Sequence, residues 1–199
     1  MARLNALLRS EWTPLLVLLL ALSAARSSLA DHYYVPSGSM EFTLMPGDRV
    51  VVNKAAYGLR IPFTKIDIMD SSAPVRGDIA IFDSPDDGAR LIKRIVAIGG
   101  DSVRLVDGRL TINGERISDV AAVNQEKFAT RRARLNLASG GGPDVLDVVI
   151  PPNMFLAIGD NRGRSRDGRY FGLIHERELY GRAVAVYYRK GDGFGWHAL

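Results

Sequence analysis

Cysteine is absent from this 199-residue chain, which excludes disulfides, cysteine nucleophiles and cysteine-ligated zinc or iron–sulfur centres. Only three histidines occur, His32, His175 and His197, so a metal site built from several histidines is not expected. A domain exposed outside the cytoplasm would therefore be held together by packing alone.

A strong excess of charge of either sign is also missing. Lys and Arg number 26 against 22 Asp and Glu, a formal net charge of +4. This mildly basic balance suits an anionic membrane surface or a nucleic acid without proving either. The most basic run, residues 131–134, has neither an aromatic platform nor a binding motif beside it, so we expect no nucleic-acid partner. A solvated or lipid-facing basic patch is favoured instead.

Long hydrophobic runs are scarce, and the chain has only one. The apolar stretch from Pro14 to Ala25 is about a dozen residues long, whereas a full membrane span usually needs roughly 20. Arg3 and Arg9 precede the stretch, which places the N-terminus in the cytoplasm and the remainder across the membrane.

Two interpretations of this segment are open. Residues 28–30, Ser-Leu-Ala, resemble the cleavage site of a secretory signal peptide. Alternatively, residues 12–30 form an uncleaved transmembrane anchor, with Trp12 at one interface and Arg26 snorkelling at the other. We favour the anchor because of the motifs that follow it.

Beyond residue 30 the segments are short, rich in β-branched residues and separated by turns, which predicts a mostly-β domain. Strands are expected within residues 48–58, 77–85, 147–162 and 181–188, with three or four more in 89–117. Within residues 89–117, the pairs Asp107-Gly108 and Asn113-Gly114 are hairpin signals. A short helix and then a glycine-rich loop are expected within 118–147, and one helical turn at 175–179.

Lys93 lies in the predicted strand RLIKRIVA. Alternation places it on the same face as Leu91, Ile95 and Ala97, while Arg94 points to the other face. A lysine among apolar neighbours loses hydration, which lowers its pKa and makes the neutral amine available as a general base. Snorkelling to water at a sheet edge is the alternative. For Arg94 a structural ion pair is expected.

Serine is a poor nucleophile until a base removes its proton, and a nearby lysine can serve as that base. The loop PSGSM, residues 36–40, suits this chemistry because Pro36 stiffens the approach and Gly38 permits a sharp turn. Ser39 would present its hydroxyl there. A second loop, GDNRGRSRDGRYFG at residues 159–172, mixes glycines with acidic and basic residues, and Ser165 is the small hydroxyl at its centre.

These motifs together resemble those of the bacterial type I signal peptidases (leader peptidases), membrane-anchored serine proteases with a Ser/Lys dyad. The matching segments occur in the family's order between about residues 34 and 188: PSGSMEFTLMPGDRVVVNK, RGDIAIF, LIKRIVAIGGD, GDNRGRSRDGRYFGLI and GRAVAVYY. A lone SGSM would be weak evidence, whereas the ordered set is very specific.

The resemblance implies a role for each matched residue. Ser39 would be the nucleophile and Lys93 the general base, with the Ser37 hydroxyl and the Ser39 backbone N–H forming an oxyanion hole. Ser165 would orient the lysine amine. The other matched residues would support the site: Asp160 paired with Arg94, Asp167 and Arg169 in the same ionic network, and Met40 packed beside the dyad.

The implied fold is a signal-peptidase-like, mostly-β catalytic domain with an inserted β-ribbon subdomain, preceded by one N-terminal transmembrane helix. We therefore divide the chain into six parts: a cytoplasmic N-terminus (1–11), the anchor (12–30), the catalytic domain in two pieces (31–103 and 148–188), the insertion (104–147) and a C-terminal tail (189–199). By resemblance the catalytic domain lies on the periplasmic side of the inner membrane.

The chain departs from the family pattern at several positions. Phe42 stands where proline is usual, Gly163-Arg164 replaces Asp-Asn, Gly168 replaces serine, and residues 99–101 read Gly-Gly-Asp in place of Pro-Gly-Asp. None of these changes removes a proposed catalytic group. They predict a looser scaffold and leave a reduced or specialised activity open.

The implied activity is endoproteolytic removal of signal peptides from exported preproteins, without metal or cofactor. Expected partners are the lipid bilayer and preproteins with small residues at the first and third positions before the cut. A specialised processing peptidase of conjugation, pilus or mitochondrial inner-membrane type remains an alternative, as does a membrane-anchored, non-catalytic β domain. A Ser-His-Asp hydrolase is disfavoured, because His32 is too close to Ser39 in sequence and His175 has no obvious acid partner.

Overall fold

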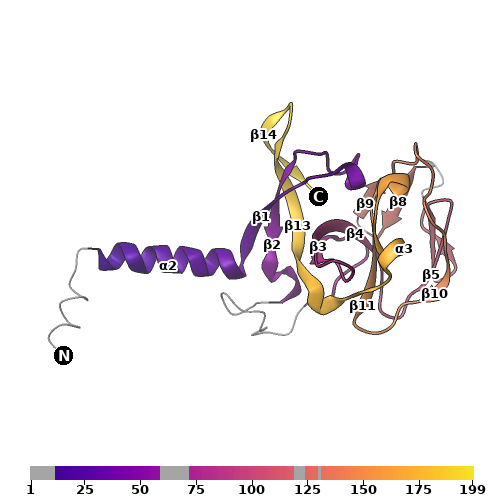
Figure 1. Cartoon of the computed structure of the whole chain (residues 1–199), viewed down its shortest axis with the longest axis horizontal. Coiled ribbons are helices and arrows are strands. Elements are labelled where there is room, and N and C mark those ends of the chain that lie inside the picture. The colour runs from indigo at the N-terminus through magenta and orange to yellow at the C-terminus, as the bar shows by residue number, and fades with distance from the viewer. Residues whose placement is uncertain (1–11, 59–71, 119–123, 130) are drawn as a thin grey trace.

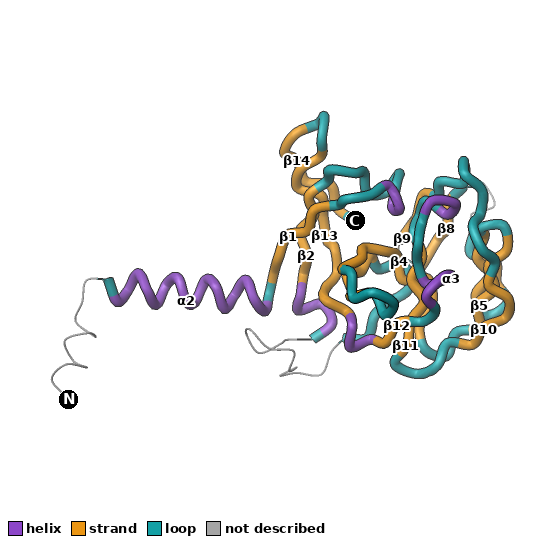
Figure 2. The backbone as a smooth tube through the Cα atoms, in the orientation of Figure 1, coloured by secondary structure: helices purple, strands orange, loops and turns teal. Residues whose placement is uncertain are grey.

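The computed structural model describes residues 12–58, 72–118, 124–129 and 131–199. Strands dominate the body of the domain, and its helical segments are short except for α2 (Thr13–Ser28), which extends away from the β domain (Figures 1 and 2). The prediction of a mostly-β domain is therefore confirmed.

Helix α2 contains 16 residues and lies within the segment predicted as an anchor. Its leucine side chains are largely exposed, for example Leu16 at 58% and Leu20 at 60%. Within the described ranges, however, no helix combines the length and apolarity needed to cross a membrane.

The largest sheet has eight strands. They are β1 (Ala30–Tyr34), β2 (Arg49–Asn53), β3 (Ile79–Asp83), β4 (Arg90–Ile98), β11 (Met154–Ile158), β12 (Ile174–His175), β13 (Leu179–Arg189) and β14 (Gly193–Ala198). Their order is β1-β2-β13-β3-β4-β11-β12, and every pairing is antiparallel. β14 pairs with residues 185–189 of β13, beyond the residues that pair with β3. The proposed tail thus contains a strand.

Two smaller sheets lie on the side of the domain away from α2 (Figure 1). One contains β5 (Ser102–Val106), β6 (Arg109–Ile112), β7 (Glu115–Arg116) and β10 (Val145–Val149), and the other contains β8 (Gln125–Phe128) and β9 (Arg131–Arg134). The proposed insertion, residues 104–147, supplies most of the strand residues of these sheets, but its boundaries stay a prediction.

The two predicted hairpin turns are confirmed. Asp107 and Gly108 have φ values of 50° and 73°, and Asn113 and Gly114 have values of 52° and 81°. Positive φ at both central residues is the type I′ geometry, which matches the twist of the strands on either side. These turns join β5 to β6 and β6 to β7, so segment 89–117 contains four strands including β4.

The expectation of a short helix within residues 118–147 is wrong for the part of this segment that the structure describes. β8 and β9 form a hairpin there instead. In β8, Glu126 and Phe128 are buried while Lys127 is exposed, so the strand does alternate. The pattern was hidden because one of its two buried residues is a glutamate.

The remaining helical segments are single turns. They are η1 (Gly38–Met40), η2 (Lys54–Tyr57), η3 (Arg162–Arg164), η4 (Glu176–Glu178) and α3 (Gly168–Phe171). The helical turn expected at 175–179 is confirmed by η4.

Strand β4 lies where separate hydrophobic clusters meet. Ile92 packs with the β2 and β13 residues of one cluster, whereas Ile95 packs with Phe82 and Phe155 of another. Residues 92–97 of β4 are all buried, so the middle of the strand is covered on both faces of the sheet.

Candidate active site

Lys93 occupies the middle of β4, opposite Ala80 of β3, and only 4% of its surface is exposed. Its Nζ lies 2.6 Å from Ser39 Oγ, and the two atoms are hydrogen-bonded. Burial lowers the pKa of Lys93 from its usual value to about 8, although the nearby carboxylates of Asp167 and Asp160 oppose this shift. A buried amine with this pKa can lose its proton near neutral pH.

Ser39 is carried by the single turn η1 and is itself buried. The hydroxyl of Ser37, one residue before the turn, donates to Ser39 Oγ over 3.3 Å. Met40 is fully buried in the cluster that contains Val35 and Leu44. The turn thus holds a serine hydroxyl between a lysine amine and a second hydroxyl.

The chain turns again directly after Ser39. Glu41 has φ −53° and ψ 145°, Phe42 has φ 78°, and the Thr43 N–H donates to the Met40 carbonyl over 3.1 Å. These values describe a type II turn, whose third position favours glycine. Proline, with φ fixed near −65°, could not occupy that position. The Phe42 ring is held by the Arg134 guanidinium, 4.8 Å from its centroid.

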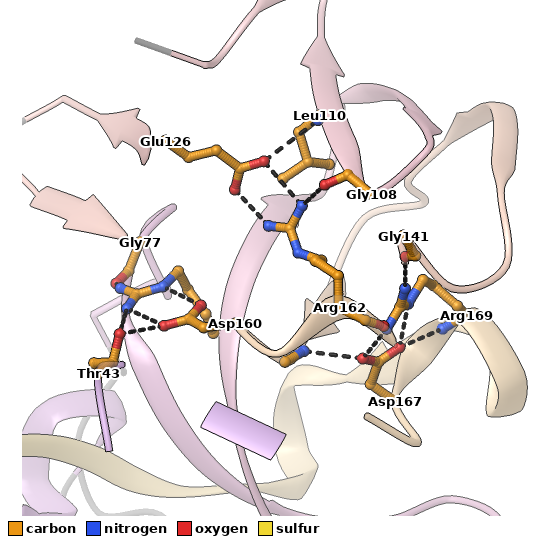
Figure 3. Close-up of polar contacts among 12 residues, drawn as sticks. Thr43, Gly77, Gly108, Leu110, Glu126, Gly141, Asp160, Arg162, Asp167 and Arg169 are labelled. Carbon is orange, nitrogen blue, oxygen red and sulfur yellow. Dashed lines mark hydrogen bonds and ion pairs between the residues drawn. The ribbon is translucent and has the colours of Figure 1, made fainter. Parts of the chain in front are cut away.

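The ion pair predicted between Arg94 and Asp160 is present, at 2.7 Å between Nη2 and Oδ2, and both side chains are buried. The Thr43 hydroxyl donates to Asp160, and Arg94 donates to the Gly77 carbonyl (Figure 3). Strand β4 therefore presents Lys93 to Ser39. The next residue of the same strand, Arg94, fixes the loop that follows β11 through its ion pair with Asp160.

Asp167 and Arg169, which the resemblance assigned to the same ionic network, form an ion pair with each other, and both side chains are completely buried. Asp167 accepts from the Gly159 N–H at 2.9 Å, while Arg169 donates to the carbonyls of Gly141 and Arg162 (Figure 3). These bonds fold residues 159–169 into a closed loop that packs against Gly141.

Ser165 lies beside the nucleophile, but it does not make the predicted hydrogen bond to the lysine amine. A Cβ atom on Gly159 would lie 2.2 Å from Ser165 Oγ and 2.4 Å from the Ser39 carbonyl oxygen, so only glycine permits this close approach. Ser165 Oγ is buried and has no hydrogen-bond partner among the described residues. Its orienting role stays a prediction.

A buried ion pair that the sequence did not predict lies behind this loop. Arg162 Nη2 lies 2.5 Å from Glu126 Oε2, and the two side chains are 1% and 0% exposed. Arg162 also donates to the Gly108 carbonyl in the turn between β5 and β6 (Figure 3). The only sequence signal was Glu126 at a buried position of an alternating strand.

One departure from the family pattern has a local explanation. A Cβ atom on Gly163 would lie 2.1 Å from the Ser139 carbonyl oxygen, so the glycine lets the loop pack directly on the backbone of Ser139 and Gly140. At this position the substitution tightens the scaffold, contrary to our expectation of a looser one.

The two histidines considered as alternative bases make their contacts with other residues. His32 Nδ1 is 3.8 Å from Asp31, and His175 Nδ1 accepts from the Arg177 N–H. Neither bonds to Ser39, whose hydroxyl contacts Lys93 and Ser37. Among the described residues, no cluster of three or more candidate metal ligands is found.

Comparison with known proteins gives a consistent result. The family model described as "Signal peptidase, peptidase S26" matches residues 9–188. Signal peptidase I from Pseudomonas fluorescens and from Pseudomonas aeruginosa are each 32% identical to this chain, over 87% of the chain and 69% of the relative. Signal peptidase I from Aquifex aeolicus is 27% identical, over 91% of this chain and 84% of the relative.

Among solved structures, a signal peptidase I from Enterococcus faecalis is 32% identical in sequence. The match covers 56% of this chain and 97% of that chain, with a TM-score of 0.39.

Proposed function

This chain belongs to the signal peptidase family, peptidase S26, and from that membership we propose how it cleaves its substrates. It is a serine endopeptidase, and it removes signal peptides from preproteins. The observation that carries the proposed mechanism is the buried contact of 2.6 Å between Lys93 Nζ and Ser39 Oγ.

The first half of the proposed reaction is acylation. Neutral Lys93 accepts the Ser39 hydroxyl proton while Ser39 Oγ attacks the scissile carbonyl carbon, giving a tetrahedral intermediate. The Ser39 N–H and the Ser37 hydroxyl stabilise its oxyanion. For this the Ser37 hydroxyl must rotate from Ser39 Oγ, which it contacts at 3.3 Å, toward the new oxygen.

The second half releases both products. The Lys93 ammonium gives its proton to the leaving amine as the carbon–nitrogen bond breaks, which frees the mature protein and leaves the signal peptide esterified to Ser39. Neutral Lys93 then removes a proton from water, and the resulting hydroxyl attacks the ester. The oxygen of Ser39 leaves with the proton from Lys93, restoring the starting state.

The buried ion pairs serve this chemistry by fixing positions. Arg94 and Asp160 hold the loop after β11 against β4, and Asp167 and Arg169 close that loop on itself. Ser165, adjacent to Ser39 and without a hydrogen-bond partner in the described part of the chain, is available to receive the lysine amine when Lys93 moves during the reaction. We assign these residues to support and orientation rather than to bond making.

We propose that substrates carry small residues at the first and third positions before the cut, as the family resemblance implies. The test is incubation of the full chain, in lipid or detergent, with a panel of preproteins, followed by mass mapping of the new N-terminus. Cleavage after small-x-small sequences is expected, with Ser39→Ala inactive because alanine has no hydroxyl to attack the carbonyl.

Two outcomes would contradict this. Cleavage by Ser39→Ala at the wild-type rate would reject the nucleophile. Cleavage of only one preprotein of the panel would favour the specialised processing peptidase over a general one. Ser72→Ala, which changes a serine far from the site in sequence, is the matched control.

We further propose that the chain is a single-pass protein of the cytoplasmic membrane, with α2 as the anchor and the catalytic domain on the extracytoplasmic side. The exposed leucines of α2 support this assignment, because such a surface is stabilised by burial in hydrocarbon. β14 is a candidate second contact with lipid, since Phe194 and Trp196 are 84% and 68% exposed beside Arg189 and Lys190.

Trp196 can report on that contact directly, because Trp12 is the only other tryptophan of the chain. In a Trp12→Phe variant of the full chain, Trp196 fluorescence is expected to shift to the blue in vesicles and to be quenched by lipids brominated near their headgroups. Emission at the wavelength of a water-exposed indole, without quenching, would dismiss the second contact. Phe194→Ala should weaken the shift.

A further inference from the structure

We propose that Glu41 is a positioning residue for the nucleophile. Its carboxylate ties the turn that carries Ser39 to the loop after β11 and to the segment after β9. The inference rests on the proposed role of Ser39, and it concerns a residue that the motif comparison left without a function.

Asn161 is the first partner of Glu41. Its side-chain Nδ2 donates to Glu41 Oε2 over 2.9 Å and to the Gly38 carbonyl over 3.0 Å. Its backbone N–H donates to the Ser39 carbonyl, also over 3.0 Å. A single asparagine therefore contacts the nucleophile itself, the residue before it and Glu41, two residues after it.

Asn136, in the segment after β9, is the second partner. Its Nδ2 donates to the same Glu41 oxygen over 2.8 Å. The Asn136 backbone donates to the Asp160 carbonyl and accepts from the Arg162 N–H, so Asn136 and Asn161 are also joined as a parallel bridge. Both asparagines are buried, which makes these bonds hard for water to replace. Glu41 closes a ring of contacts among three segments far apart in sequence.

The turn needs this restraint because it contains an unfavourable backbone conformation. Phe42 has φ 78°, a value that side chains other than glycine adopt rarely and only where their surroundings enforce it. Glu41 directly precedes Phe42 and anchors the turn through two hydrogen bonds to a charged acceptor, which are stronger than neutral ones. Without them the turn is free to relax, and Ser39 Oγ leaves its position beside Lys93.

The geometry also separates hydrogen bonding from charge. Both asparagines donate to one oxygen, Oε2, so the single carbonyl oxygen of a glutamine can accept both bonds. If Glu41 acts by positioning, Glu41→Gln preserves its action. If it acts by placing negative charge near Lys93, Glu41→Gln abolishes that action and shifts the pH dependence.

The experiment compares steady-state cleavage of a preprotein by Glu41→Ala, Glu41→Gln and the full-length wild type. A nucleophile displaced by about 1 Å can cost on the order of 10²-fold in rate. We expect Glu41→Ala to lower kcat by about that factor, with KM and the acid limb of the pH profile unchanged. Glu41→Gln should recover most of the loss. Glu115→Ala, which removes an exposed carboxylate of β7, is the matched control.

Full kcat in Glu41→Ala overturns the proposal, and so does a Glu41→Gln variant that is as slow as Glu41→Ala. If Glu41→Ala fails to fold, as judged by its thermal transition, Asn136→Ala provides the test. It removes one of the two bonds and should lower kcat by about tenfold; full kcat in a folded Asn136→Ala also overturns the proposal. The Ser39→Ala variant distinguishes failure of the proposed mechanism from failure of this inference. Activity in Ser39→Ala would reject the mechanism. An inactive Ser39→Ala together with a fully active Glu41→Ala would reject only the role of Glu41.

Discussion

Replacing Lys93 by methionine is expected to lower preprotein cleavage by about 10⁴-fold, the upper range for removing a general acid–base group. Methionine keeps an unbranched apolar stem in the buried position but cannot accept the Ser39 proton. Since desolvation of the charged amine is also removed, the variant should fold at least as well as the wild type. The measurement is the single-turnover rate on a preprotein.

Two further variants sharpen this test. Lys93→Arg keeps a cation but cannot lose its proton, so it should be as inactive as Lys93→Met if the neutral amine is the base. Lys127→Met removes an exposed lysine of β8 and should leave the rate unchanged. Cleavage by Lys93→Met at a rate near that of the wild type would reject Lys93 as the base.

The same amine should set the acid limb of the pH profile. Burial lowers the pKa of Lys93 to about 8, so the active neutral form predominates above that pH and is lost below it. The value of kcat/KM should therefore fall about tenfold per pH unit as the pH drops below the pKa, and level off above it. A rate that stays constant from pH 8 to pH 6 would contradict a neutral lysine base.

The second large effect concerns stability. Glu126→Gln is expected to lower the free energy of unfolding by about 3–5 kcal/mol, because it leaves the buried Arg162 guanidinium without a counter-charge. Glutamine matches the size of glutamate, so little of the loss comes from packing. Denaturant unfolding of the full chain in detergent, followed by circular dichroism, gives the value.

An exposed ion pair in the neighbouring sheet provides the control. The side chains of Arg104 and Asp147 are 51% and 67% exposed, and Asp147→Asn should change stability by about 1 kcal/mol or less. Combining Glu126→Leu with Arg162→Met should recover much of the loss, because no isolated charge remains buried. If Glu126→Gln lowers the free energy of unfolding no more than Asp147→Asn does, the buried pair stabilises the fold no more than an exposed pair.

The predictions that succeeded depend on neighbours in sequence. Alternation in β4 placed Lys93 on an apolar face and Arg94 on the opposite one, and the structure pairs these residues with Ser39 and Asp160 respectively. The Asp-Gly and Asn-Gly turns were equally local, since two adjacent residues determine their φ values. The prediction that the Ser39 loop contacts β4 depended on the family resemblance, because no periodicity in the sequence indicates that contact.

The failures depend on contacts between residues far apart in sequence. Glu41 and Asn136 are separated by 95 positions, and neither has a local pattern that marks it. Strand β8 was not predicted because its buried Glu126 forms an ion pair with Arg162, which lies 36 positions away in sequence. β14 was read as a tail because its glycines favour neither strand nor helix, and only pairing with β13 makes it a strand.

The type II turn at Met40–Thr43 has a consequence for engineering. A consensus library for this family would install proline at position 42, since that is the residue the family pattern favours there. Proline requires a negative φ, whereas Phe42 has φ 78°, so Phe42→Pro would change the turn and displace the nearby Ser39. The consensus residue is therefore unsuitable at position 42 of this chain. Glycine or asparagine is compatible with the positive φ there.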